Sequence, residues 1–181
     1  MGTEIVPLIV IVIRTLVPFT ILRWPLGGMV LAILADASDA MVFEKFGVGY
    51  PGVENYHVAD KFFDTYYLFF AYLVVHRWKN TLARRTAKVL FLWRFAGFVA
   101  FEFTGLPYIA FLAPNIFENF YLFWAIVLKL FPSFKLTPAR LAVVLFVVGF
   151  PKVIQEYLMH YKYPGQTWHF FRDNLFWWLY K

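Results

Sequence analysis

The chain contains no cysteine and few charged residues. With no cysteine among its 181 residues, disulfide bonds, thiolate nucleophiles and cysteine-ligated metal sites are excluded. Only 15% of the residues are charged, whereas about a quarter are charged in a typical soluble domain. The sequence also lacks a phosphate-binding glycine loop, a nucleophile elbow and a zinc-binding histidine pattern. None of the motifs that mark these nucleotide-binding, hydrolase and zinc sites is therefore present.

The sequence is instead strongly apolar. Hydrophobic residues make up 61% of the chain and aromatic residues 23%, and tyrosine and tryptophan gather near the ends of the apolar runs, as they do at membrane interfaces. The net charge of +6 suits anionic lipid headgroups better than nucleic acid. We therefore expect an integral membrane protein surrounded by lipid, with no nucleic-acid partner. The composition does not identify the membrane.

Apolar runs predict an all-α, polytopic membrane protein that folds as one six-helix bundle. A membrane-spanning helix needs roughly 20 apolar residues. The opening segment lacks the basic region and cleavage site of a signal peptide, so we expect it to be retained as the first span. A kink is expected at Pro151 in the last span. The six predicted spans are residues 5–22, 26–43, 59–75, 89–103, 116–131 and 139–157.

Two further segments do not fit a spanning helix. Residues 106–113 are apolar but too short to cross, and prolines bound them. In the tail, residues 165–181, large apolar side chains recur at helical spacing between charged ones. We expect this tail to form a helix that lies in the membrane interface. Residues 1–181 are thus predicted to form a single membrane domain.

Four aspartates flank the loop between the second and third predicted spans. Asp36 and Asp39 are three residues apart, and Asp60 and Asp64 are four apart, so each pair shares one face of a helix. The short loop predicts that the two helices are antiparallel neighbours, which would bring the four acids together. Ionised carboxylates inside a membrane are costly and usually functional.

This arrangement of acids predicts a divalent metal site. Carboxylate oxygens suit Mg²⁺ or Mn²⁺, and two such cations could clamp a diphosphate. We predict Asp36, Asp39, Asp60 and Asp64 as metal ligands, with Asp60 and Asp64 also as catalytic residues; an acid spared from ligation could deprotonate an attacking hydroxyl. The alternative is structural, with the acids near helix ends and Asp60 capping the third span.

At these residues the sequence resembles the CDP-alcohol phosphotransferases. That family carries D-x2-D-G-x2-A-R-x8-G-x3-D-x3-D on the second and third of six spans. Asp36 and Asp39 match the first pair of acids, Ala59-Asp60-Lys61 is similar to the family's A-D-K, and Arg14 precedes Pro18 in a similar first span. The resemblance covers roughly residues 8–75. It implies a six-helix membrane enzyme that uses Mg²⁺ or Mn²⁺.

The chain departs from the family pattern at positions that help hold the CDP portion. Ala40 stands for the first glycine, and Glu44 for the arginine. One alignment of Asp60 places Gly52 on the second glycine and Tyr56 on the third aspartate; another, with a three-residue insertion, places Tyr56 on the glycine. We take these four positions as candidate nucleotide-binding positions, and expect metal binding to be retained and CDP recognition to be weakened.

Two functions follow from these expectations. The first is a metal-dependent transferase acting on a phospholipid or isoprenoid phosphate, in which Asp64 is either a metal ligand or the base. The second is a non-catalytic relative of the family that serves as a membrane partner subunit or lipid-binding protein. Four retained acids favour the first, and the replaced glycine and arginine favour the second. The sequence leaves a homodimer or a subunit of a larger complex open.

The charge distribution and the resemblance predict opposite orientations. The stretch from His76 to Lys88 is the most basic in the chain, and by the positive-inside rule it would be cytoplasmic, with the aspartates on the other side. The resemblance would place the aspartates in the cytoplasm.

The roles of two residues near the aspartates also stay open. Arg14 could offset the acids or reach a phosphate, and His57 could be a ligand or a phosphate contact.

Overall fold

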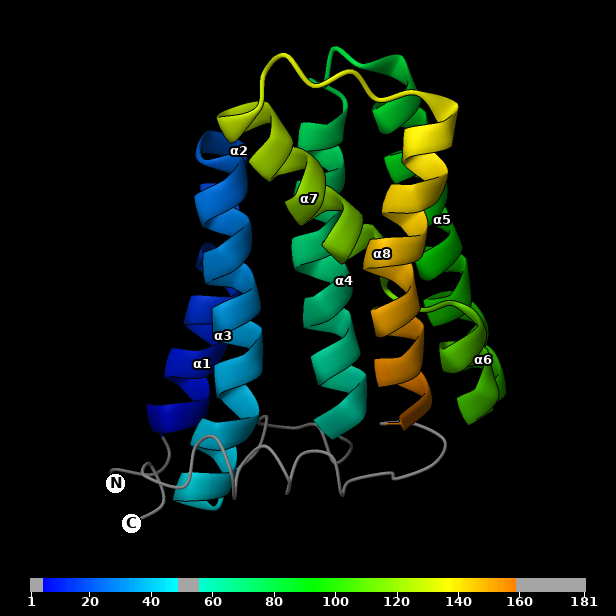
Figure 1. The fold of residues 1–181 in the computed structure, drawn as a ribbon. Coiled ribbons are helices and arrows are strands. Elements are labelled where there is room, and N and C mark those ends of the chain that lie inside the picture. Colours follow the sequence, from blue (N-terminus) through cyan, green and yellow to red (C-terminus); the bar gives the residue numbers. More distant parts are fainter. Residues whose placement is uncertain (1–4, 49–55, 159–181) are drawn as a thin grey trace. The chain divides into compact units, whose positions relative to one another are not determined.

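The structure is a computed structural model that describes residues 5–48 and 56–158. In these residues every regular element is a helix, which confirms the all-α prediction. Of the eight helices in this part of the chain, six are long, and α2 and α6 are short (Figure 1). The helices are α1 (Ile5–Leu16), α2 (Phe19–Arg23), α3 (Pro25–Phe46), α4 (Tyr56–Val75), α5 (Thr81–Thr104), α6 (Pro107–Leu112), α7 (Ile116–Leu130) and α8 (Pro138–Tyr157).

Three stretches of the described residues are long and apolar enough to cross a membrane. They are Ile5–Arg23, Pro25–Phe46 and Pro138–Tyr157. Helix α7, with 15 residues, would reach only about 22 Å at 1.5 Å per residue, less than the ~30 Å of hydrocarbon. The six-span prediction is thus supported at three positions, and the interfacial helix predicted for residues 165–181 lies outside the described residues.

The helices differ from the predicted spans in two places. The first predicted span is interrupted at Val17 and Pro18, which separate α1 from α2. Proline has no N–H to donate to the carbonyl of Arg14, and its ring crowds the preceding turn. The Tyr66 hydroxyl donates to the Thr15 carbonyl at 3.4 Å next to this break. Helix α8, by contrast, continues through Pro151.

The other difference concerns the basic stretch from His76 to Lys88, which lies between the third and fourth predicted spans. Helix α5 already begins at Thr81, because the Asn80 side chain caps it by accepting from the Ala83 N–H at 2.9 Å. Arginine, lysine and alanine, which are good helix formers, then fill the first turns. Arg84 and Arg85 therefore lie on a helix.

The chain divides into two compact units, residues 1–79 and 80–181. The first unit contains α1 to α4, and all the predicted site residues belong to it. Helix α3 contacts α1, α2 and α4, and α3 and α4 run in opposite directions (Figure 1). The predicted antiparallel neighbours are therefore confirmed.

Close packing fixes the first unit at both ends of α3. Near its start, a Cβ on Gly28 would lie 2.4 Å from the Ile21 backbone nitrogen, so only glycine allows this approach of α2 to α3. Near its end, buried Phe43 packs with Val10 of α1, and Phe63 of α4 packs against them. Gly47 then ends α3 in the left-handed conformation at φ 61°. These contacts set the register in which α1, α3 and α4 present their polar side chains.

The second unit contains α5 to α8. Helix α5 contacts α6 and α7, and α8 contacts α6 and α7. Buried aromatic side chains of α7, including Phe117, Tyr121 and Trp124, form much of its core. Lys152 and Glu156 pair at 3.9 Å one turn apart on α8. Arg94 donates to the Ala113 carbonyl at 2.9 Å, and Glu102 is exposed.

Candidate metal site

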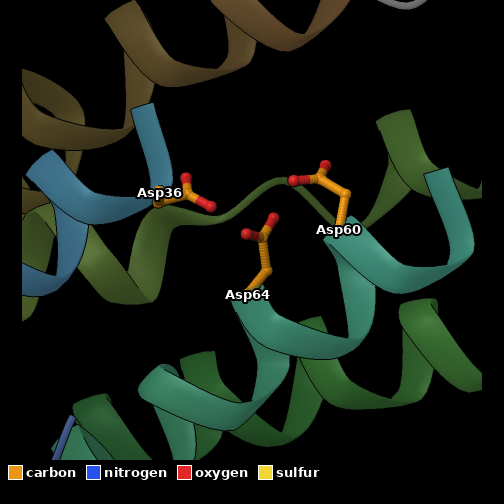
Figure 2. Close-up of side chains that lie close together, drawn as sticks. All are labelled: Asp36, Asp60 and Asp64. Carbon is orange, nitrogen blue, oxygen red and sulfur yellow. The ribbon is translucent and has the colours of Figure 1, made fainter. Parts of the chain in front are cut away.

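Acids from two helices meet in the first unit. Helix α3 supplies Asp36 and Asp39, and α4 supplies Asp60 and Asp64. Figure 2 shows the carboxylates of Asp36, Asp60 and Asp64 turned toward a common space, and one oxygen from each lies within 4.8 Å of the others. The antiparallel packing of α3 and α4 thus brings the two acidic pairs together, as their spacing predicts.

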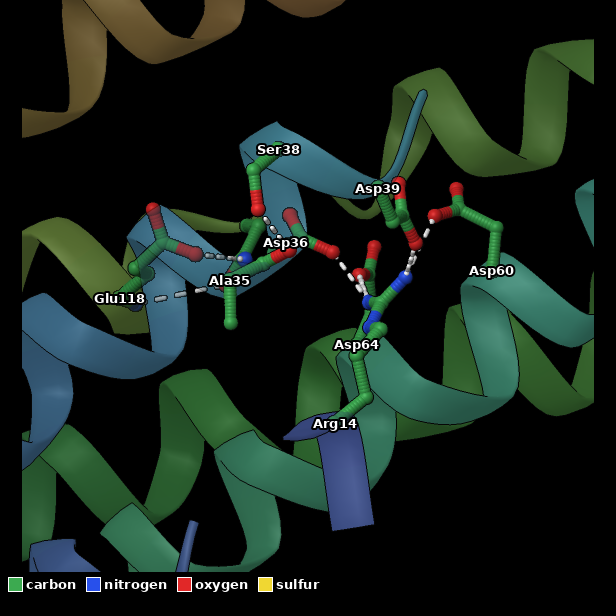
Figure 3. Close-up of polar contacts among 9 residues, drawn as sticks. Arg14, Ala35, Asp36, Ser38, Asp39, Asp60, Asp64 and Glu118 are labelled. Atoms are coloured by element: carbon green, nitrogen blue, oxygen red, sulfur yellow. Dashed lines mark hydrogen bonds and ion pairs between the residues drawn. The ribbon is translucent and has the colours of Figure 1, made fainter. Parts of the chain in front are cut away.

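Arg14 of α1 lies at the centre of these acids and contacts all four (Figure 3). Its Nη1 donates to Asp39 and, at 3.2 Å, to Asp60 Oδ1. Its Nη2 donates to Asp36 and, at 3.0 Å, to Asp64 Oδ1. Hydrogen bonds between ionised partners are about twice as strong as neutral ones. Arg14 is therefore the counter-ion of the cluster and joins α1 to α3 and α4.

The cluster has a buried side and a more open side. The side chains of Arg14 and Asp39 are 2% and 1% exposed. Those of Asp36, Asp60 and Asp64 are 28%, 27% and 21% exposed. The three acids whose oxygens converge are thus also the three that solvent reaches.

Capping does not explain these acids. Helix α4 begins at Tyr56, so Asp60 lies a full turn inside it, where the backbone N–H groups already have helical partners. Helix α3 continues to Phe46, which leaves both Asp36 and Asp39 in its interior. An N-cap role is excluded for Asp60, and the acids face Arg14 instead.

The formal charge of the cluster favours a further cation. Four ionised carboxylates and one guanidinium carry a net charge of −3, and burying uncompensated charge is strongly unfavourable. Protons or a cation must offset part of it. The donor atoms on the open side are hard carboxylate oxygens, which Mg²⁺ and Mn²⁺ prefer. The residues present therefore fit a divalent metal.

Apolar side chains also lie against Arg14. The guanidinium carbon lies 5.2 Å from the centre of the Phe63 ring, within the range of a cation–π contact. A small pocket also borders Arg14. Its other lining residues are Val17, Pro18, Ala32, Ala35, Phe63 and Tyr67.

The predicted nucleotide-binding positions are less fully described. Ala40 and Glu44 lie on α3 beyond Asp39, with Glu44 exposed. Gly52 lies outside the described residues. Tyr56 is the first residue of α4, and neither its side chain nor that of His57 is described.

Sequence reasoning left the role of Arg14 open, although an arginine within an apolar run needs an acidic partner.

Over the described residues, the fold and this cluster together define a class: a helical protein with three stretches long and apolar enough to cross a membrane and a buried arginine–carboxylate centre. Comparison with known proteins assigns it to no family: no protein-family model, curated protein or solved structure matches the chain.

Proposed function

We propose that this protein is a divergent relative of the CDP-alcohol phosphotransferases, a metal-dependent membrane transferase acting on a phospholipid or isoprenoid phosphate. The observation that carries the proposal is the convergence of Asp36, Asp60 and Asp64 within 4.8 Å on the open side of a cluster with a formal charge of −3. The matching spacing of Asp36 and Asp39 supports it. The proposal includes six membrane spans. Three of them coincide with stretches of the described residues that are long and apolar enough to cross a membrane.

In this proposal the residues of the chain have distinct tasks. Asp36 and Asp60, from different helices, hold Mg²⁺ or Mn²⁺. A bound divalent ion supplies charge neutralisation for a phosphate or diphosphate group and lowers the barrier to its displacement. Asp64 is either a further ligand or the base that removes the proton from an acceptor hydroxyl. The exposed apolar side chains of α1 and α3, such as Leu8 and Leu34, suit a lipid substrate held by its chain.

One observation favours the non-catalytic alternative. Arg14 already contacts all four carboxylates, so the cluster could serve mainly to join α1, α3 and α4. Glu44, in place of the family's arginine, would repel a phosphate. A membrane partner subunit or lipid-binding protein would retain such a cluster without turnover.

The experiment that separates these functions is an assay of the purified full-length protein with Mg²⁺. CDP-alcohols and prenyl diphosphates are offered with hydroxyl acceptors, and Asp64→Asn is the control. We expect turnover of a prenyl diphosphate or another lipid phosphate that the Asp64→Asn protein loses. Robust CMP release from a CDP-alcohol would show that nucleotide recognition survives the departures. No turnover with either class, together with no metal binding, would favour the partner-subunit function.

A further inference from the structure

The first two turns of α5 carry positive charge on the helix face turned away from the core of the second unit. Ala83 and Ala87 are fully buried on one side of the helix. On the other side Arg85 is exposed and Lys88 partly exposed, and because they are three residues apart they are neighbours on the helix surface. Arg84 lies beside them, four residues before Lys88. We call Arg84, Arg85 and Lys88 the cationic stripe.

The cationic stripe is unfavourable for α5 taken alone. Like charges three or four residues apart on a helix destabilise it, and the amino end of a helix favours negative rather than positive charge. The first turn of α5 contains no acidic residue that would offset these charges. An anionic partner lying against Arg85 and Lys88 would relieve both effects, so the stripe favours such a partner.

Charge is segregated along the helices of the second unit. Helices α5 and α8 run in the same direction and α7 in the opposite one (Figure 1). Among the described residues of this unit, the acids lie at the ends of their helices remote from the stripe: Glu102 in the last turn of α5, Glu118 in the first turn of α7 and Glu156 in the last turn of α8. Three further cations share the end of the stripe, namely Lys129, Lys135 and Arg140.

The exposed face of α5 changes from charged to apolar in a single step. Directly after Lys88, the side chains of Val89 and Leu92 are 65% and 54% exposed. Helix α8, which is long and apolar enough to cross a membrane, changes in the same way, from exposed Arg140 to exposed Val143. Long basic side chains beside exposed apolar ones are typical of a helix that passes from the headgroups of a bilayer into its hydrocarbon.

One kind of partner fits both parts of this surface. An anionic phospholipid carries its phosphate next to apolar chains, so its headgroup can lie on Arg85 and Lys88 while its chains cover Val89 and Leu92. A free phosphate ion or an acidic soluble protein would offset the charge of the stripe but would leave the apolar side chains in contact with water, which is unfavourable.

We propose that the cationic stripe binds the headgroup of an anionic phospholipid, with the acyl chains along Val89 and Leu92. The headgroup phosphate accepts hydrogen bonds from Arg85 and Lys88, and such charge-assisted bonds are stronger than neutral ones. This inference goes beyond the proposed transferase, because the stripe belongs to the second unit and the aspartates to the first. It depends on the membrane setting and not on turnover.

The experiment measures thermal unfolding of the full-length protein in neutral detergent, with a short-chain phosphatidylglycerol or with the phosphatidylcholine of the same acyl chains. Because a ligand that binds the folded state stabilises it, we expect the unfolding temperature to rise with phosphatidylglycerol and much less with phosphatidylcholine. In the double variant Arg85→Gln with Lys88→Gln, the apparent dissociation constant for phosphatidylglycerol should rise at least about tenfold, since each cation near a lipid surface contributes substantially.

Controls separate the stripe from net charge. Arg85→Lys with Lys88→Arg keeps both charges and should bind phosphatidylglycerol within about threefold of wild type. Lys88→Gln and Lys45→Gln form a matched pair, since each removes one lysine, but Lys45 lies in the last turn of α3 in the first unit. Lys88→Gln should weaken binding about fivefold, and Lys45→Gln should leave it unchanged. Without anionic lipid, the double glutamine variant should be at least as stable as wild type, because it lacks the repulsion within the stripe.

Three results would overturn the inference. Equal stabilisation by both lipids would mean that the contact is apolar only. Equal stabilisation by inorganic phosphate at the same concentration would assign the stripe to a soluble anion. Equal weakening in Lys88→Gln and Lys45→Gln would mean that net charge, rather than the stripe, attracts the lipid. None of these results bears on the transferase, whose test is turnover and metal binding at the aspartates.

Discussion

Arg14 on α1 and Asp39 on α3 form an ion pair that is almost completely removed from solvent. Removing charges from water costs free energy, and a buried pair recovers it only when its hydrogen bonds are complete. Here the guanidinium has carboxylate partners on both Nη atoms. The pair therefore joins α1 to α3 inside the first unit, in the register that the apolar packing around it sets.

Removing the arginine should destabilise the protein strongly. Arg14→Gln leaves the carboxylates of α3 and α4 without their cation, and breaking a buried ion pair from one side costs about 3–5 kcal/mol. The measurement is the free energy of unfolding in detergent without added metal. Arg85→Gln, at an exposed position on α5, is the control and should stay within about 0.5 kcal/mol of wild type.

A double-mutant cycle extends this test to the pair itself. Asp39→Asn in the Arg14→Gln background removes one of the acids that lost its partner, so the double mutant should be less destabilised than the sum of the single mutants. Additive effects would mean that Arg14 and Asp39 do not interact in the folded protein.

The packing of α2 against α3 gives a second stability prediction with a matched control. Gly28→Ala would place the new Cβ 2.4 Å from the Ile21 backbone nitrogen. Backbone atoms cannot move aside as a flexible side chain would, and overpacking of this kind typically costs about 1–3 kcal/mol. At Gly27 the new Cβ would find its nearest neighbour, Trp24 Cβ, at an ordinary 3.9 Å. Gly27→Ala should therefore be neutral or stabilising. The thermal unfolding of the two variants, compared with wild type, checks both expectations.

The convergence of the acids could be predicted from the sequence, and the role of Arg14 could not. Helical spacing placed Asp36 with Asp39 and Asp60 with Asp64, and the short connection between the helices placed the pairs side by side. The contacts of Arg14 depend instead on the register of α1 against α3 and α4, which apolar packing around Val10, Phe43 and Phe63 sets. Sequence spacing carries no information about that register.

Hydropathy likewise predicted the positions of the helices better than their ends. The apolar run of α5 begins near Val89, but the helix begins at Thr81 because Asn80 caps it. At Pro18 the reverse holds, since the apolar run continues while the helix is interrupted. Burial patterns locate a helix, whereas capping side chains and proline decide where its hydrogen bonds start and stop.

The orientation in the membrane can be tested because the chain has no cysteine. Single cysteines are introduced in place of Arg85 and Gly49 and labelled from one side in intact cells. The positive-inside rule predicts that position 85 is cytoplasmic and position 49 is not. Labelling that places position 49 in the cytoplasm would instead support the orientation of the CDP-alcohol phosphotransferases.

Restoring the family's arginine should strengthen nucleotide binding. Glu44 is exposed on α3, beyond Asp36 and Asp39 on the same helix, and its carboxylate would repel the phosphates of CDP. Glu44→Arg reverses that charge and adds donors that can bind phosphate in a bidentate manner. We expect the wild-type protein to bind CDP weakly in the presence of Mg²⁺, and the variant to bind at least about tenfold more tightly, a gain of 1.4 kcal/mol. Calorimetry with CDP measures this, with Lys45→Arg as the control for a neighbouring change that keeps its charge. If Glu44→Arg and Lys45→Arg bind CDP equally, residue 44 does not face a nucleotide site, and the resemblance in this part of α3 is limited to the aspartates.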